Sequence, residues 1–348
     1  MPTSGGRRMP ERFLVISTTG IGDTLMATPA LRALRERFPQ SQIHFVVYST
    51  RRDLVLRNPH LDRIFAYRNN IFSRFLLYLQ TRRCRYDVVL VFHANDDILK
   101  LLPRLRFGAC YNRQGIQNPQ RKIFSLHPPE RHSIKKRLAM VEQISGSHSE
   151  DYRYEFRLKE GMARWADAKL REWGLAPGEL LVGLQLGAAG AFRRWPAESF
   201  AEVARRLRAK HQAKIFVNAS VEEAELVRDF AKNLGDQDFF FHPRTQISQA
   251  AALIGSCSLF ITPDTGPMHV AIGLGVPLIA LFVPPDPEET GPLDYPGAVV
   301  IKKERTCSPC LVRKCLDNFC VRQITPEEVC NAADRLLGAR RSPKESAV

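Results

Sequence analysis

The sequence lacks a long hydrophobic run. Its best apolar stretch, Val270 to Val283, is broken by glycines and Pro277, whereas a membrane-spanning helix needs roughly 18–20 consecutive apolar residues. The N-terminal segment is charged but has no apolar region of signal-peptide length. Low-complexity segments and short repeats are also missing. These absences predict a soluble, folded protein that stays in the cytoplasm, where cysteines are reduced.

Acidic residues are scarce in the first half of the chain. Residues 1–150 contain 25 Lys and Arg against 11 Asp and Glu, a net charge of +14, whereas residues 151–348 contain 26 against 25, a net charge of +1. Such a one-sided field attracts an anionic partner to one part of a protein. Charge alone leaves three partners open: nucleic acid, a phospholipid surface and a phosphorylated glycolipid.

Apolar runs alternate with helical periodicity twice along the 348 residues, which predicts two α/β domains with parallel sheets. We expect an N-terminal domain over 1–150 and a C-terminal domain over 151–337, joined by the polar segment Gly146 to Leu158. The clearest predicted helix covers Gly22 to Phe38. The predicted strands are Arg12–Ser17, Gln42–Tyr48, Arg63–Tyr67, Asp87–His93, Arg106–Cys110, Leu181–Leu186, Lys214–Asn218, Phe239–His242, Leu259–Thr262 and Pro277–Phe282.

A last helix is predicted from Thr325 to about Leu337. Thr325 is a favoured N-cap, Pro326 suits the first turn and Glu328 completes a capping box. We expect this helix to pack back on a domain, with the N-terminal domain as a candidate.

A glycine loop, STTGIGDTL, links the first predicted strand to the first helix. Gly20 and Gly22 match the start of a dinucleotide fingerprint, but Leu25 replaces the third glycine. Asp23 would also repel a pyrophosphate on this helix. Two interpretations of Asp23 stay open: a first-turn carboxylate that complements the helix dipole, or a general base at a strand end.

Two further segments could hold a phosphorylated ligand. The segment Ile261 to His269 leads into a helix, whose free N–H groups could bind phosphate beside Thr265 and Gly266, with His269 as an added donor. The alternative is a capped helix with a solvent-facing histidine. Arg193 and Arg194 follow a strand end and could clamp a diphosphate, unless they are a solvated pair with Trp195 packed beneath them.

Taken together, these segments and the run Ala27 to Leu34 resemble the heptosyltransferase family, glycosyltransferase family 9. The resemblance extends from about residue 12 to residue 337 and implies a GT-B fold, in which two Rossmann-like parallel-sheet domains face each other across a cleft. It further implies an inverting transfer of L-glycero-D-manno-heptose from ADP-heptose to the inner core of lipopolysaccharide. The acceptor would bind the N-terminal domain and the nucleotide-sugar the C-terminal one. No cofactor is expected for catalysis.

The resemblance also assigns roles to residues. Asp23 matches the proposed catalytic base, and Gly22 and Thr24 belong to the same acceptor loop. Arg193 stands where the family usually has a Lys that contacts the donor diphosphate. The other candidate donor-binding residues are Arg194, Asp264, Thr265, Gly266, Pro267, His269 and Glu223, the last as a possible ribose ligand or a solvated helix residue. The basic first half would face the anionic acceptor at the inner surface of the cytoplasmic membrane, so we expect peripheral membrane association and no nucleic acid.

Cysteines cluster near the C-terminus, at Cys307, Cys310, Cys315 and Cys320. They could hold a structural zinc ion or iron–sulfur cluster, form a disulfide or remain reduced thiols. Asp96 and Asp97 follow a strand but lack partners for a catalytic metal site. Two alternatives to a heptosyltransferase stay open: a GT-B enzyme using another nucleotide-sugar, and a basic nucleic-acid-binding protein with a cysteine metal knuckle.

Overall fold

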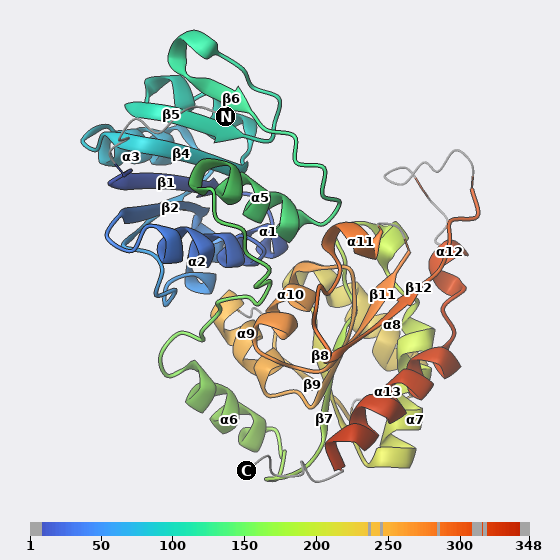
Figure 1. Ribbon diagram of the computed structural model, residues 1–348. Coiled ribbons are helices and arrows are strands. Elements are labelled where there is room, and N and C mark those ends of the chain that lie inside the picture. The colour runs from blue at the N-terminus through green and yellow to red at the C-terminus, as the bar shows by residue number, and fades with distance from the viewer. Residues whose placement is uncertain are drawn as a thin grey trace, which may run out of the picture. The chain divides into compact units, whose positions relative to one another are not determined.

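The structure is a computed structural model that describes residues 9–235, 238–243, 246–283, 286–307, 315 and 319–341. It divides into two units, Met1–Arg157 and Leu158–Val348. Each unit contains one six-stranded sheet whose strands all run parallel (Figure 1).

The sheet of the first unit has the strand order β3-β2-β1-β4-β5-β6. Its strands are β1 Arg12–Ser17, β2 Gln42–Tyr48, β3 Arg63–Tyr67, β4 Tyr86–His93, β5 Phe107–Asn112 and β6 Ile123–Ser125. Its helices are α1 Ile21–Leu25, α2 Thr28–Arg37, α3 Ile71–Arg82, α4 Asp96–Leu99 and α5 Ser133–Ser145, with 3-10 turns η1 Ser49–Leu54, η2 Leu102–Arg104 and η3 Pro119–Arg121. Five consecutive residues of β1 are buried, as expected for a central strand covered on both faces.

The second unit repeats this plan with the order β12-β11-β10-β7-β8-β9. Its strands are β7 Leu181–Gln185, β8 Lys214–Asn218, β9 Phe240–Phe241, β10 Leu259–Pro263, β11 Leu278–Phe282 and β12 Ala298–Lys302. Its helices are α6 Met162–Glu172, α7 Ala197–His211, α8 Ala224–Leu234, α9 Ile247–Gly255, α10 Gly266–Gly273, α11 Pro287–Thr290, α12 Phe319–Arg322 and α13 Pro326–Arg341, with η4 Ala191–Arg193 and η5 Val221–Glu223. Numbered within its own unit, each sheet has the Rossmann order 3-2-1-4-5-6.

All ten predicted strands are present with small shifts at their ends, but two strands were missed. β6 has three residues, and β12 is an edge strand with no fully buried residue, so neither shows a strong apolar pattern. The segment after Asp286 forms the short helix α11. None of the helices in the described part of the chain has the length and hydrophobicity to cross a bilayer.

The predicted helix over Gly22 to Phe38 is wrong in one respect, because it is two helices. α1 ends at Leu25 and α2 begins at Thr28. Pro29 lacks an N–H group, so it cannot continue the hydrogen-bond ladder of α1 but fits the first turn of a new helix. The Thr28 hydroxyl donates to the Leu25 carbonyl at 2.7 Å and fills the gap at the break.

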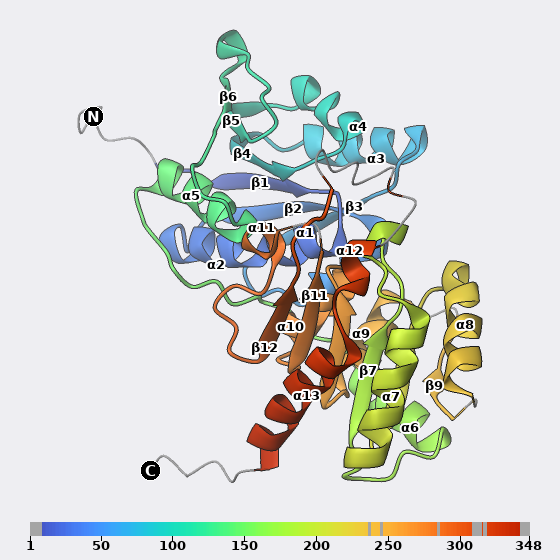
Figure 2. The same ribbon diagram turned by 90° about the vertical axis from the view of Figure 1, so that its right-hand side faces the viewer.

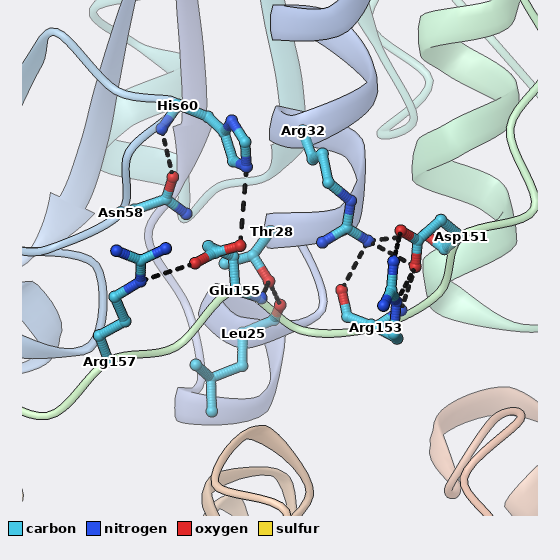
Figure 3. A network of polar contacts seen from close by, with 9 residues as sticks. All are labelled: Leu25, Thr28, Arg32, Asn58, His60, Asp151, Arg153, Glu155 and Arg157. Carbon is cyan, nitrogen blue, oxygen red and sulfur yellow. Dashed lines mark hydrogen bonds and ion pairs between the residues drawn. The ribbon is translucent and has the colours of Figure 1, made fainter. Parts of the chain in front are cut away.

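The polar segment predicted as a linker is held against α2 over part of its length (Figure 3). Arg32 forms an ion pair with Asp151 at 2.9 Å and donates to the Arg153 carbonyl at 2.8 Å. The Glu155 N–H group donates to the Thr28 hydroxyl at 3.0 Å. These bonds explain why the division between the units comes after Arg157 rather than at residue 150.

The last helix, α13, packs within the second unit. Val329, Ala333 and Leu337 are buried in the core of that unit, and both views show α13 beside α7 (Figure 2). The predicted capping box is confirmed: the Glu328 N–H donates to the Thr325 hydroxyl at 3.2 Å, and the Thr325 N–H donates to the Glu328 carboxylate at 2.9 Å.

Candidate active site

Asp23 lies at the carboxyl end of β1, in the first turn of α1. Its Oδ2 atom accepts hydrogen bonds from the Gly20 N–H group at 3.1 Å and from the Thr19 hydroxyl at 2.7 Å. The bond from Gly20 is the capping contact that a first-turn carboxylate makes. Asp23 therefore does complement the start of the helix, and this does not prevent a second role.

A buried arginine from α5 holds the other carboxylate oxygen. Arg137 has a side chain only 1% exposed, and its Nη2 atom donates to Asp23 Oδ1 at 2.9 Å. Its Nη1 atom donates to the Ser133 carbonyl at 2.8 Å, which fixes the guanidinium within its own helix. A buried ion pair holds its geometry only when such additional hydrogen bonds support it. Arg137, fixed in this way, in turn fixes the position of the Asp23 carboxylate.

The Asp23 carboxylate is ionised at neutral pH. Burial alone would raise its pKa, but the opposing effects of Arg137, His93 and the hydrogen bonds from Thr19 and Gly20 are larger together and lower the pKa to about 2. The side chain remains 26% exposed, so a ligand can reach it. Two donors already occupy Oδ2 and one occupies Oδ1, which leaves the free acceptor capacity on Oδ1.

More positive charge surrounds this carboxylate than it can neutralise. His93, at the end of β4, has its Nδ1 atom 2.8 Å from the Thr19 hydroxyl. Arg51 and Arg113 both interact electrostatically with Asp23, and burial is the main cause that lowers the pKa of each guanidinium. Three arginines near one carboxylate give the carboxyl edge of this sheet a net positive field.

The neighbouring residue Thr24 has a structural place. It is fully buried, and its hydroxyl donates to the Gly20 carbonyl at 3.0 Å. Gly22 lies in the same turn, and its carbonyl accepts from the Met26 N–H group at 2.8 Å. Both residues shape the loop that presents Asp23, and the Thr24 hydroxyl is already bonded.

The second unit brings Arg193 and Asp264 together at the carboxyl ends of β7 and β10. Arg193 Nη1 donates to Asp264 Oδ2 at 2.9 Å. Burial raises the pKa of Asp264, and the nearby guanidinium opposes that rise. Arg193 Nε is buried without a hydrogen-bond partner. An unsatisfied buried donor of this kind marks a place that a ligand could complete.

Asp264 leads directly into the start of α10. Thr265 is its N-cap residue, with its hydroxyl 3.1 Å from that of Thr262 rather than bonded to the helix, and Gly266 and Pro267 form the first turn. The first-turn N–H groups therefore have no side-chain cap. His269 was weighed as a solvent-facing residue, but it is buried, with only 3% of its surface exposed.

The remaining predicted donor residues lie near the end of β7. Arg194 Nε donates to the Ala188 carbonyl at 3.2 Å, and Trp195 is buried with its indole N–H donating to the Ile324 carbonyl at 2.9 Å. The Glu223 carboxylate lies against the backbone of Gly187, where a side chain would overlap it. Only glycine permits this approach, which places Glu223 at the strand end rather than on an outward helix face.

Comparison with known families shows which family the chain belongs to. The model of glycosyltransferase family 9 (heptosyltransferase) matches residues 77–319, more than half of the chain. The chain belongs to glycosyltransferase family 9. It is an enzyme that transfers a sugar, and the alternative of a basic nucleic-acid-binding protein is not favoured.

Curated relatives agree with this family 9 assignment. The chain is 28% identical to lipooligosaccharide heptosyltransferase 2 of Campylobacter jejuni, over 92% of this chain and 96% of the relative. It is also 28% identical to lipopolysaccharide heptosyltransferase 2 of Escherichia coli, over 83% and 87% of the two chains.

Solved structures establish the fold of this family 9 enzyme. A glycosyltransferase family 9 protein from Veillonella parvula superposes with a TM-score of 0.83 at 24% identity, over 94% of this chain and 98% of that one. Escherichia coli ADP-heptose lipopolysaccharide heptosyltransferase II gives a TM-score of 0.74 at 23% identity, over 95% and 100%. The fold class is α/β, of the GT-B type with two Rossmann-like domains.

Sequence reasoning on this glycosyltransferase missed the partners of Asp23. Thr19 lies in the quoted loop, but Arg137 is distant in the sequence. One signal was available: Arg137 shares a helical face with Ile134, Leu138 and Val141, all of which are buried. A charged residue at a core position requires a partner, and a carboxylate is the usual one.

No group of three His, Cys, Asp or Glu side chains that could hold a metal ion occurs among the residues that the structure describes. Asp97, which the sequence did not favour as a metal ligand, pairs with Arg74 at 2.5 Å. Of the cysteine cluster, Cys307, Cys315 and Cys320 are free thiols, whereas Cys310 lies outside the described residues.

Proposed function

We propose that this family 9 glycosyltransferase transfers heptose from ADP-L-glycero-D-manno-heptose to the inner core of lipopolysaccharide, with inversion at the anomeric carbon. The names of its relatives support the transferred sugar and the acceptor. The observation that carries the chemistry is the Asp23 carboxylate, held ionised by buried Arg137 yet partly open to solvent.

In this proposal Asp23 is the general base of a single displacement. The acceptor hydroxyl oxygen attacks the anomeric carbon of the heptose as the bond from that carbon to the phosphate oxygen breaks. The hydroxyl proton passes to Asp23 Oδ1, the oxygen with free acceptor capacity, and ADP departs with the bonding electron pair. A carboxylate with a low pKa can accept this proton because the hydroxyl becomes acidic as its new bond forms.

We assign the donor to the second unit. Arg193 and the first-turn N–H groups of α10, beside Thr265, Gly266 and Pro267, would stabilise the negative charge that develops on the departing diphosphate. Arg replaces the Lys expected from the family, so it keeps the positive charge and adds a planar fork of N–H donors that can bind phosphate in a bidentate way. Asp264, which orients Arg193, would contact sugar hydroxyls, and Glu223 would contact the ribose.

The remaining donor candidates would act through neighbouring groups. Arg194, bonded to the Ala188 carbonyl, would steady the loop that carries Arg193. His269, buried in the first turns of α10, would support the helix start, and Pro267 would preset its backbone.

We assign the acceptor to the first unit, whose net positive field supports an anionic acceptor. Arg51 and Arg113, near Asp23, would attract the phosphorylated inner core. An acceptor anchored in lipid would bring the enzyme to the inner face of the cytoplasmic membrane as a peripheral protein.

Catalysis in this proposal needs no cofactor, because arginines and helix N–H groups supply the positive charge at the diphosphate. A structural metal, weighed for Cys307, Cys310, Cys315 and Cys320 together, would take no part in the transfer. The first test is direct: the purified chain, ADP-heptose and a heptose-free core acceptor should give a product larger by one heptose in mass spectrometry, and chelator should not reduce the rate. Absence of product, with ADP-heptose bound or not, would refute the proposed function.

A further inference from the structure

Helix α3 of the first unit exposes an unusual amount of apolar surface. Ile71 is 78% exposed, Phe72 68%, Phe75 55% and Leu76 40%. These four residues, here called the α3 face, account for four of the nine large apolar side chains exposed in the described part of the chain. A contiguous apolar patch, unlike scattered single residues, marks an interaction site.

The α3 face is distinct from the side of the helix that packs on the sheet. Leu77 and Thr81 lie on the inner side and are buried, Leu77 within the core of the first unit. Helical spacing places residues 71, 72, 75 and 76 together on the other side. The helix is therefore apolar on two sides. One side packs on the core of the first unit, and the α3 face is exposed.

The exposed side is not the result of a poorly held helix. The Asn70 side chain caps α3 by accepting from the Ser73 N–H group at 2.8 Å. Arg74 pairs with Asp97 of α4, and the Thr81 hydroxyl donates to the Leu77 carbonyl at 2.7 Å. A firmly anchored helix thus presents two phenylalanines outward.

The charge around α3 is of one sign. Residues 63–86 contain six arginines and no Asp or Glu. Arg68 precedes the helix, Arg82 and Arg83 close it, Arg85 follows it, and all four are exposed. Apolar residues flanked by arginines are typical of helices that lie in a membrane interface, because the guanidinium groups pair with anionic lipid headgroups while the rings enter the acyl boundary.

The position of α3 in the sheet links it to the base. α3 follows β3, so its first turn, with Ile71 and Phe72, comes after the carboxyl end of that strand. β1, β2 and β3 are parallel and in register, with Ser17 beside Val47 and Tyr48 beside Tyr67. The first turn of α3 and the Asp23 loop therefore lie at the same edge of one sheet.

We propose that the α3 face, with Arg68 and Arg82, docks this enzyme on an anionic lipid bilayer and so brings the Asp23 edge to an acceptor held in that bilayer. The inference rests on the proposed function, in which the acceptor is a lipid. A second copy of the chain is the weaker occupant, because a symmetric contact would place one arginine-rich surface against another.

Vesicle sedimentation tests this docking surface. The full chain should bind vesicles of phosphatidylethanolamine with phosphatidylglycerol, and bind vesicles of phosphatidylcholine alone much more weakly. The variant Phe72→Ser with Phe75→Ser should lose roughly tenfold or more in vesicle affinity, since two exposed rings no longer enter the interface. Val221→Ser removes an exposed apolar side chain from the second unit and should bind like the wild type.

Transfer assays separate this inference from the proposed function. With acceptor dispersed in detergent, the double variant should turn over like the wild type; with acceptor in vesicles, its rate should fall in step with its vesicle binding. Equal vesicle binding by variant and wild type would overturn the docking surface while leaving transfer intact. Loss of a dimer in the variant, with no vesicle binding by the wild type, would overturn it in favour of a second copy.

Discussion

At the scale of single residues, Asp23 combines a helix cap with a buried ion pair. One oxygen caps α1 through Gly20, and the other meets Arg137 while keeping free acceptor capacity. A carboxylate fixed in this way loses little freedom when an acceptor binds. The arrangement also explains why an anion occupies a glycine loop at a helix start, where a phosphate would be expected.

The first prediction concerns the base itself. Asp23→Ala should lower kcat by a factor of about 10²–10⁴, the range for loss of a general base, and should leave the Kd for ADP-heptose nearly unchanged, since the donor is assigned to the other unit. Steady-state kinetics and calorimetry measure the two quantities. Asp23→Asn is the control, because it keeps an oxygen for the Gly20 cap. An equal loss of donor affinity, or undiminished turnover, would contradict the assignment.

The second prediction concerns Arg137, a positioning residue. In the wild type the pKa of Asp23 is about 2, so the base stays ionised throughout the range from pH 5 to 8. In Arg137→Met the raising effect of burial remains and the largest lowering effect is gone, so the pKa rises and the acid limb of kcat/KM should move to higher pH. Arg137→Lys should move it back in part.

The same ion pair has a consequence for stability. A carboxylate whose folded pKa is depressed stabilises the protein above its unfolded pKa, near 4, and that contribution is lost as pH falls toward 2. The free energies of unfolding of the wild type and Arg137→Met, measured in urea, should therefore converge at low pH.

The kinetic outcome decides the positioning role of Arg137. If the pH–rate profile of Arg137→Met were the same as that of the wild type, this role would be refuted.

The third prediction concerns Arg193. Arg193→Ala should raise the KM for ADP-heptose roughly tenfold or more, because it removes a charged donor and leaves buried Asp264 without its ion-pair partner. Arg193→Lys, which keeps the charge, should retain most of the activity. An exposed arginine of the same unit, Arg228, gives the matched control Arg228→Ala. If Arg193→Ala bound the donor like the wild type, the diphosphate assignment would be wrong.

At the scale of elements, the segment after α5 is more than a connection. Arg32 of α2 binds Asp151 and the Arg153 carbonyl, and Thr28 binds the Glu155 N–H group (Figure 3). The segment from Asp151 to Glu155, here called the strap, covers the break between α1 and α2. This break is also the end of the turn that carries Asp23. Polar residues here do not indicate a free linker, because their hydrogen bonds are made to a helix.

The fourth prediction tests this strap. Arg32→Met should lower the free energy of unfolding by about 2 kcal/mol, since a partly buried charged hydrogen-bond donor is lost, and should speed tryptic cleavage after Arg153 and Arg157. Denaturant titration and timed proteolysis give the two readouts. Arg52→Met, at an exposed arginine of the same unit, should change neither. Unchanged cleavage in Arg32→Met would show that the strap is not held by this residue.

At the scale of the whole molecule, net charge distinguishes the two units. The first half carries +14 and the second +1, in line with a phosphorylated acceptor on one and a nucleotide-sugar on the other. Salt screens the long-range attraction between the basic first unit and an anionic acceptor. It screens close contacts in a half-buried site, such as the one assigned to the nucleotide-sugar, to a smaller extent.

The fifth prediction follows from that separation. Raising the salt concentration should lower kcat/KM for the lipid acceptor several-fold, because the basic field no longer concentrates it, while the Kd for ADP-heptose changes less. Initial rates and calorimetry over a salt series measure both. If salt weakened ADP-heptose binding as much as it lowered kcat/KM for the acceptor, the assignment of acceptor and donor to different units would be contradicted.

The fold could be predicted from the sequence to a large extent, and the site in part. Apolar runs such as Phe13–Ile16 can be buried only as central strands, and the ten predicted strands are present. The glycine loop with Asp23 and the run from Asp264 to His269 were recognisable because their chemistry is local. β6 and β12 escaped prediction because their pairing, rather than their composition, makes them strands.

The sequence by itself thus determined the class of fold and the family and singled out Asp23 as the proposed base, since each depends on short segments with a distinct pattern. Only the tertiary structure decided what surrounds that base. Arg137 lies 114 residues from Asp23 in the chain, and their ion pair exists because α5 packs beside α2. The same holds for α3: its composition is that of a core helix, and packing alone decided that Phe72 and Phe75 lie outside.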